Sequence, residues 1–138
     1  MSKNCIVAQS GGPTAAINAS LAGVVAAARD FGIYDKIYGA IHGIQGVLKK
    51  HFLDLSDKDD AFIQKLARTP AMYLGSCRFK LPEMKDDVSM YEEIFSIFEE
   101  MNIGAFFYIG GNDSMDTVAK LSAYAASIGN DIRIIGVP

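Results

Sequence analysis

The stretch AFFYIGGNDS, residues 105–114, joins a continuous apolar run to paired glycines and three small polar residues. An apolar run of this length predicts a parallel strand that is covered on both faces. The glycines and polar residues after it predict a loop that leads into a helix. Helical spacing continues over residues 115–128, and IRIIGV at 132–137 is typical of another strand. The carboxyl-terminal part is therefore predicted as strand, loop, helix and strand.

A similar unit begins the chain. The apolar run CIVA at residues 5–8 predicts a strand, and SGGPT at 10–14 predicts the loop after it. Small and apolar residues then recur at helical spacing over 14–30, with Thr14 as the expected N-cap and Gly32 as the stop. Residues 36–41 are expected to form a second strand.

The middle of the chain contains an amphipathic helix at 87–101 and a shorter helical pattern at 61–67. Segment 42–47 is punctuated by glycines, the stretch 52–60 is polar and acidic, and a loop is expected at 74–80. Strands that alternate with helices predict an α/β fold, in this case a three-layer Rossmann-like domain with a mainly parallel sheet. Ligands of such folds bind beyond the carboxyl ends of the strands.

Composition limits the classes of function. The 138 residues suit one domain, and the net charge of −3 provides no overall positive field for nucleic acid or anionic lipid. Cys5 and Cys77 lie too far apart in sequence to suggest a disulfide framework or a zinc site, and no run reaches the ~18 apolar residues of a membrane span. We expect a cytoplasmic protein with neither nucleic acid nor membrane as a partner.

Both glycine-containing loops are candidate phosphate sites. Glycine lets the backbone approach an anion closely, and the amino end of the following helix attracts it. Neither 10–14 nor 110–114 matches the G-x-G-x-x-G pattern or the G-K-[ST] ending, so a dinucleotide fingerprint and a P-loop are excluded. Tight turns without a ligand are the alternative interpretation.

Polar residues beside these loops allow two interpretations. Asn112, Asp113 and Ser114 are residue types that cap helices, and they are also suited to ligand binding. A carboxylate at 4 Å from a phosphate repels it by ~4 kcal/mol at an effective dielectric near 20, which suggests either a bridging Mg²⁺ or a role in exclusion. Arg78 is either a phosphoryl-binding group or a surface arginine.

Four segments resemble the N-terminal part of the 6-phosphofructokinases in order and spacing. They are SGGPTAAIN at 10–18, GSCRF at 75–79, IGGNDS at 109–114 and IGVP at 135–138, so the resemblance extends over nearly the whole chain. It implies phosphoryl transfer, with Mg²⁺, to the 1-hydroxyl of fructose 6-phosphate, giving fructose 1,6-bisphosphate. Positioning and charge neutralisation carry such reactions.

The resemblance also implies residue roles. Arg78 would reach the transferring group, Asn112 and Asp113 would be associated with the metal, and the donor phosphates would contact Gly11, Gly12, Gly110, Gly111 and Ser114. ATP-using members typically have Asp-Gly where this chain has Asn112-Asp113. Because the carboxylate of Asp113 should obstruct the α-phosphate of a nucleotide, the pattern favours a pyrophosphate-dependent enzyme. An ATP-dependent member that tolerates Asp113 and a non-catalytic regulatory or scaffold relative are the alternatives.

Relatives of this kind continue past Gly-Val-Pro into a loop that carries the general base, and then into a substrate domain. We therefore expect residues 1–138 to be the donor-binding domain of an incomplete phosphofructokinase fold, inactive alone. The resemblance further implies a homo-oligomer at full length. An exposed apolar face and self-association of the isolated domain are also expected.

Overall fold

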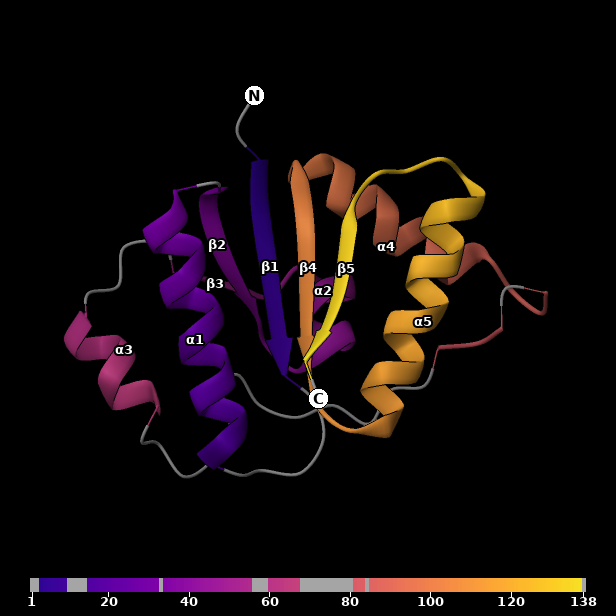
Figure 1. The fold of residues 1–138 in the computed structure, drawn as a ribbon. Helices are drawn as coiled ribbons and strands as arrows, with labels where there is room; N and C mark the ends of the chain where they lie inside the picture. The colour runs from indigo at the N-terminus through magenta and orange to yellow at the C-terminus, as the bar shows by residue number, and fades with distance from the viewer. Residues whose placement is uncertain are drawn as a thin grey trace.

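A computed structural model provides the structure, and it describes residues 3–9, 15–32, 34–55, 60–67, 81–83 and 85–137. Within these residues a sheet of five strands has helices on both faces (Figure 1). The strands are β1 (Lys3–Gln9), β2 (Tyr34–Ala40), β3 (Phe52–Asp54), β4 (Ile103–Ile109) and β5 (Arg133–Val137). The helices are α1 (Ala15–Phe31), α2 (Gly43–Lys49), α3 (Asp60–Ala67), α4 (Ser89–Glu100) and α5 (Asn112–Ser127).

The strand order is β3-β2-β1-β4-β5. Strand β1 runs parallel to both β2 and β4, and β5 runs parallel to β4. Only the β2–β3 pair among the described strands is antiparallel. The predicted α/β class with a mainly parallel sheet is confirmed.

The side chains of β1 pack alternately in two hydrophobic cores, because successive residues of a strand point to opposite faces. Ile6 packs in the core formed with α2, α4 and α5, where Tyr91 and Phe98 are buried. Cys5 and Val7 pack in the other core, which α1 and α3 cover. Strand β1 is thus covered on both sides.

Two elements were not predicted. The glycine-punctuated segment 42–47 begins helix α2, because its glycines permit close packing: a Cβ on Gly46 would lie 1.7 Å from the carbonyl oxygen of Ile41. Part of the acidic stretch forms the short edge strand β3, whose Leu53 pairs with Gly39. A three-residue edge strand leaves little unpaired backbone exposed.

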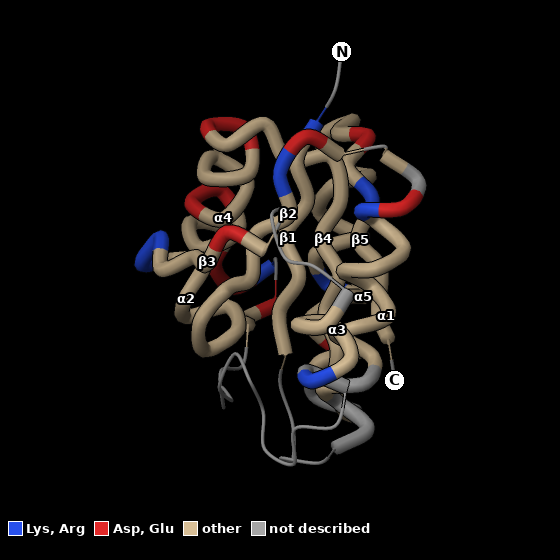
Figure 2. Tube along the Cα trace, turned by 90° about the vertical axis from the view of Figure 1, so that its left-hand side faces the viewer, with Lys and Arg blue, Asp and Glu red and all other residues tan. Residues whose placement is uncertain are grey.

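Charges of both signs are interspersed on the side of the molecule shown in Figure 2. Exposed ion pairs link Lys36 to Asp54 at 3.2 Å and Lys50 to Glu100 at 2.7 Å. Exposed pairs of this kind contribute less than about 1 kcal/mol each. Among the described residues, no helix is long and apolar enough to cross a membrane.

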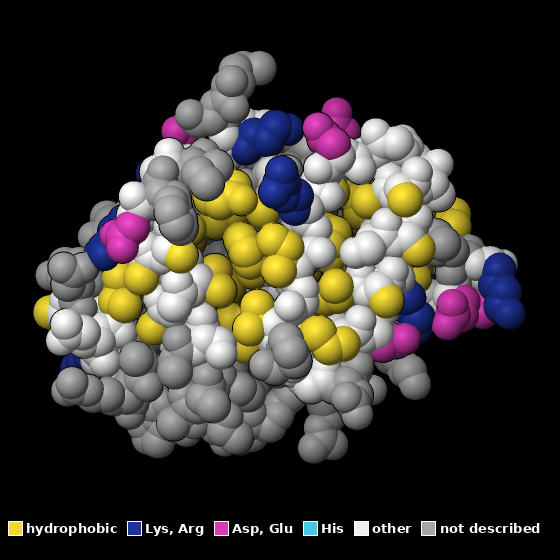
Figure 3. Space-filling view, viewed as in Figure 1, with side chains coloured by type: hydrophobic (Ala, Val, Ile, Leu, Met, Phe, Trp, Pro, Cys, Tyr) yellow, Lys and Arg dark blue, Asp and Glu magenta, His cyan; other side chains and the backbone are white. Residues whose placement is uncertain are grey.

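One stretch of the α1-covered face is open. Figure 3 shows apolar side chains exposed over β4 and β5, between α1 and α5. A hollow of about 420 Å³ lies there, and we call it the α1 groove; its lining includes Gly23, Val24, Ala27, Phe107 and Val137. The expectation of an exposed apolar face is met by this groove, whereas self-association stays a prediction.

Candidate phosphate-binding site

The candidate site lies at the carboxyl ends of β1 and β4. Gln9 pairs with Ile109 in the parallel register, so the two strands end side by side. From β1 the chain continues to α1 on one face of the sheet, and from β4 it continues to α5, which packs in the core on the other face. Such a divergence is the switch point at which open α/β sheets bind ligands.

The loop after β4 is hydrogen-bonded to β5, and one of its glycines has open space beside it. Gly110 is buried and its N–H donates to the carbonyl of Val137 at 3.0 Å, which fixes the loop to the end of β5. Gly111 has a φ of −90°, which any residue can adopt, and a Cβ there would meet nothing within 4 Å among the described atoms. Packing against the described residues therefore does not require a glycine at this position.

Helix α5 begins earlier than its periodicity predicted. The polar residues 112–114 form its first turn, and Gly111 is the N-cap, with no side-chain cap hydrogen bond. The interpretation that Asn112, Asp113 or Ser114 caps the helix is wrong, because the capping position is held by a residue without a side chain. The first intrahelical bond joins the N–H of Met115 to the carbonyl of Gly111 at 3.0 Å. The N–H groups before it carry the positive end of the helix dipole and suit an anion.

Ser114 adds a hydroxyl to this helix end. Its side chain is only 2 % exposed, and Oγ has no hydrogen-bond partner among the described residues. A buried hydroxyl without a partner costs roughly 1–3 kcal/mol. A bound phosphate oxygen would remove that cost.

A buried amide pair supports the other half of the site. Gln9 and Asn18 are both fully buried, and Nε2 of Gln9 donates to Oδ1 of Asn18 at 2.9 Å. This bond joins the end of β1 to α1 across the loop 10–14. The helical spacing over 14–30 and the resemblance of segment 10–18 both include Asn18, but neither predicts this hydrogen bond. The polar Gln9 at the end of an apolar strand was the available signal.

The first turn of α5 also packs closely on β5. A Cβ built on Gly136 would lie 2.6 Å from Sδ of Met115 and 3.5 Å from Cγ1 of Val118. Glycine at this strand position therefore allows the helix end to approach the sheet. Gly136 belongs to segment 135–138, which carries the family resemblance, but no local pattern predicted its close contact with α5.

The remaining candidates are placed only in part. Gly11, Gly12 and Arg78 lie outside the described residues, as do the side chains of Asn112 and Asp113. No cluster of three His, Cys, Asp or Glu side chains suited to a metal occurs in the part of the chain that the structure describes.

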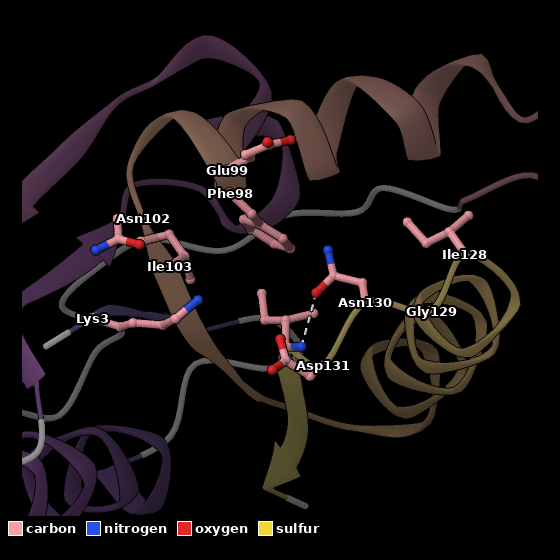
Figure 4. Close-up of a pocket in the computed structure, with 10 residues that line it drawn as sticks. Lys3, Phe98, Glu99, Asn102, Ile103, Ile128, Gly129, Asn130 and Asp131 are labelled. Atoms are coloured by element: carbon pink, nitrogen blue, oxygen red, sulfur yellow. Dashed lines mark hydrogen bonds between the residues drawn. The ribbon is translucent and has the colours of Figure 1, made fainter. Parts of the chain in front are cut away.

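A polar hollow of about 350 Å³ lies at the opposite, amino end of the strands (Figure 4). Lys3, Glu99 and Asp131 lie around it, and Oδ1 of Asn130 accepts a hydrogen bond from the N–H of Ile132 at 2.9 Å. None of the candidate phosphate-binding residues lines it. The candidate phosphate-binding site and this hollow therefore lie at opposite ends of the strands.

The described features define a doubly wound α/β domain with the amino end of α5 at its switch point. The chain belongs to the phosphofructokinase family, whose model, described as Phosphofructokinase, matches residues 4–138. This match confirms the resemblance seen in the four sequence segments.

Individual relatives carry more specific names. The chain is 44 % identical over 133 residues to a pyrophosphate--fructose 6-phosphate 1-phosphotransferase of Rhodospirillum rubrum, a match that covers 96 % of this chain and 32 % of the relative. An ATP-dependent 6-phosphofructokinase of Histophilus somni is 30 % identical, with 100 % of this chain and 39 % of the relative covered.

Solved structures agree with the fold. The crystal structure of a pyrophosphate-dependent phosphofructokinase from Nitrosospira multiformis superposes with a TM-score of 0.90 at 42 % identity, over 100 % of this chain and 34 % of that one. The chain spans about a third of the length of these relatives.

Proposed function

We propose that the chain is the donor-binding domain, residues 1–138, of a pyrophosphate-dependent 6-phosphofructokinase. The full enzyme would transfer a phosphoryl group from pyrophosphate to the 1-hydroxyl of fructose 6-phosphate and release fructose 1,6-bisphosphate. The observation that carries the proposal is the side-by-side ending of β1 and β4, each followed by a glycine-containing loop. The name of the relative from Rhodospirillum rubrum supports pyrophosphate as donor.

The donor phosphates would be bound by backbone and hydroxyl groups. The N–H groups at the start of α5 and Oγ of Ser114 would donate to one phosphate, and Gly110 and Gly111 would allow it to approach. Gly11 and Gly12 would do the same from the loop after β1. Arg78 would stabilise the charge that develops on the transferring group, since preorganised donors contribute most to this type of reaction.

Mg²⁺ fits the residue types at the start of α5. This cation usually binds through one or two carboxylates together with substrate phosphates and waters, so it does not require a complete protein cage. Asp113 and Asn112 would provide the protein oxygens, and the ion would neutralise charge on the donor. The carboxylate of Asp116 is engaged elsewhere, 2.8 Å from Nζ of Lys120.

Donor choice tests the role of Asp113. The Asp113→Gly variant of the full-length enzyme should use ATP better and pyrophosphate worse, because it removes both a side chain and a charge that repels by ~4 kcal/mol at 4 Å and an effective dielectric near 20. The ratio of kcat/KM values for the two donors measures this, with Asp131→Asn at the opposite edge as the control. An unchanged ratio would refute the role and favour the ATP-dependent alternative, which the Histophilus somni relative represents.

Residues 1–138 alone should not turn over, since the implied base and sugar-phosphate site belong to the part of the relatives that this chain does not match. A coupled assay with fructose 6-phosphate, Mg²⁺ and either donor tests this. Sugar phosphorylation well above background by the 138-residue chain would contradict the assignment of the base and the sugar-phosphate site to the unmatched part of the relatives. Silence of the full-length protein with both donors would favour a non-catalytic relative.

A further inference from the structure

The α1 groove lies where one layer of the fold is incomplete. Helices α1 and α3 pack on this face of the sheet, whereas α2, α4 and α5 pack on the other. In Figure 1 both α1 and α3 lie toward β1, β2 and β3, and no described helix lies in front of β4 and β5. A helix is about 10 Å across and neighbouring strands are about 4.8 Å apart, so one helix covers about two strands. The gap over β4 and β5 therefore has the width of one helix.

Exposure along β5 shows the same gap. Ile135 pairs with Phe107 of β4, and Ile135 and Val137 point to the α1 face because successive strand residues alternate. Ile135 is 37 % exposed, and Phe107 and Val137 are only half-buried. On the opposite face α5 packs so closely that a Cβ on Gly136 would lie 2.6 Å from Sδ of Met115. Since parallel strands are ordinarily covered on both faces, the exposed side of β5 is a surface that another element should cover.

The wall of the groove that α1 forms is made of small side chains. Ser20, Gly23 and Ala27 line it, and their spacing places them on one face of the helix. Gly23 is exposed, and a Cβ there would meet nothing within 4 Å among the described atoms. Small side chains allow two packed helices to approach to the short end of the usual range of about 8–10 Å between axes. None of the described residues that line the groove is charged, so its occupant should be apolar.

The length of the relatives indicates where this occupant comes from. The match covers 32 % of the relative from Rhodospirillum rubrum and 34 % of the Nitrosospira multiformis chain, so most of each relative lies outside the matched region. A segment tethered in the same polypeptide faces the groove at an effective concentration on the order of 1 mM, whereas a second copy reaches it only by free encounter. A tethered segment is therefore favoured over a second copy.

We propose that the α1 groove is the docking surface for an apolar helix of the same polypeptide, from the part of the full-length protein that lies outside residues 1–138. The helix lies beside α1 over β4 and β5 and buries Val24, Phe107 and Ile135. The groove thus joins residues 1–138 to the rest of the protein on the face opposite α5. This inference goes beyond the proposed function and does not depend on which phosphoryl donor the enzyme uses.

Cysteine labelling of the full-length protein tests the proposal. Val24→Cys places a thiol in the groove, and Ala123→Cys is the control, because Ala123 is exposed on α5. The 138-residue chain with the same substitutions, at low concentration where self-association is least, is the reference for an open groove. Maleimide labelling is followed over a range of protein concentrations and located by peptide mass. Cys5 is an internal reference, because it is fully buried and burial raises its pKa to about 12.

We expect Val24→Cys to label about 10-fold more slowly in the full-length protein than in the 138-residue chain, at every protein concentration, because the thiol reacts only when the helix opens locally. Ala123→Cys should label at similar rates in both. A benzophenone maleimide attached at position 24 should, on irradiation, join a peptide from outside residues 1–138 whose apolar residues recur at helical spacing. Gly23→Leu should lower the Tm of the full-length protein by displacing the helix, but not that of the 138-residue chain, where the new side chain has open space.

Three results would overturn the proposal. Equal labelling of Val24→Cys in the two proteins would show that the groove is open at full length. Protection that grows with protein concentration would assign the groove to a second copy. A cross-link within residues 1–138, or to a peptide without helical spacing, would assign it to a different segment. If Val24→Cys does not fold, Ala27→Cys on the same wall decides by the same measurements.

Discussion

Replacement of Ser114 by alanine should have opposite effects on the free protein and on donor binding. The Oγ atom is buried without a partner among the described residues, so folding removes it from water and returns no hydrogen bond from those residues. Alanine has no such group, and it also has the higher helix propensity. The unliganded Ser114→Ala variant should therefore be at least as stable as the wild type.

The size of both effects follows from this burial. Loss of an unsatisfied hydroxyl should raise the free energy of unfolding by about 1 kcal/mol, the lower end of the cost of such a group. For a domain of this size that corresponds to roughly 4 °C in Tm. A hydrogen bond from Oγ to a charged phosphate contributes about 1.5–3 kcal/mol, so the Kd for pyrophosphate should rise about 10- to 150-fold.

Thermal unfolding without ligand and calorimetric titration with pyrophosphate and Mg²⁺ measure the two effects. Ser127→Ala is the matched control, because it lies in the last turn of the same helix, is exposed, and donates only to the carbonyl of Tyr124 at 2.7 Å. It should leave pyrophosphate affinity unchanged. A destabilised Ser114→Ala variant with wild-type affinity would show that the hydroxyl has an internal structural role, and the assignment of Ser114 to the donor would fail.

Three further predictions concern packing and ionisation. Gly136→Val should displace the first turn of α5 and weaken pyrophosphate binding, whereas Gly136→Ala should be milder because the nearest atom, Sδ of Met115, belongs to a flexible side chain; titration of both variants checks this. Burial raises the pKa of Cys5 from 9.0 to about 12, so the folded protein keeps a proton that the unfolded chain loses. Stability should therefore fall as pH rises above about 9, by up to about 1.4 kcal/mol per pH unit from this group, and urea unfolding of Cys5→Ala should give a shallower decline. Val24→Lys in the α1 groove should reduce self-association of the 138-residue chain in sedimentation velocity, and a wild-type chain that sediments as a sharp monomer would contradict the premise.

The sequence predicted those helices and strands whose own residues show helical spacing or a continuous apolar run. The apolar run before Gly110 became β4, and the helical spacing before it became α4, with bounds that differ from the expected ones by a few residues. Strand β1 was predicted in the same way as β4. In both, turn residues follow a continuous apolar run of four or five residues. Sequence therefore predicted the edge of the sheet at which the candidate site lies.

Residues whose importance depends on a distant neighbour were missed. The glycines near residue 46 gave no prediction of α2, but one of them allows this helix to pack against the carbonyl of Ile41. The amide pair of Gln9 and Asn18 and the contact of Gly136 with Met115 join elements that periodicity treats separately. No window of sequence contains both partners of the bond from Lys120 to Leu81, which are 39 residues apart.

Two of these contacts involve α5, and a double variant tests whether they act together. Gly136 sets the distance of its first turn from β5, and Lys120 connects its middle to the segment after Arg78. If both act by setting the place of α5 relative to the donor, Gly136→Val should already disturb the contact between Lys120 and Leu81. The double variant Gly136→Val/Lys120→Met should then lose less in kcat/KM for pyrophosphate than the product of the single losses, because neighbouring residues with a shared consequence are not additive. Losses that multiply within about twofold would mean that Gly136 and Lys120 act independently.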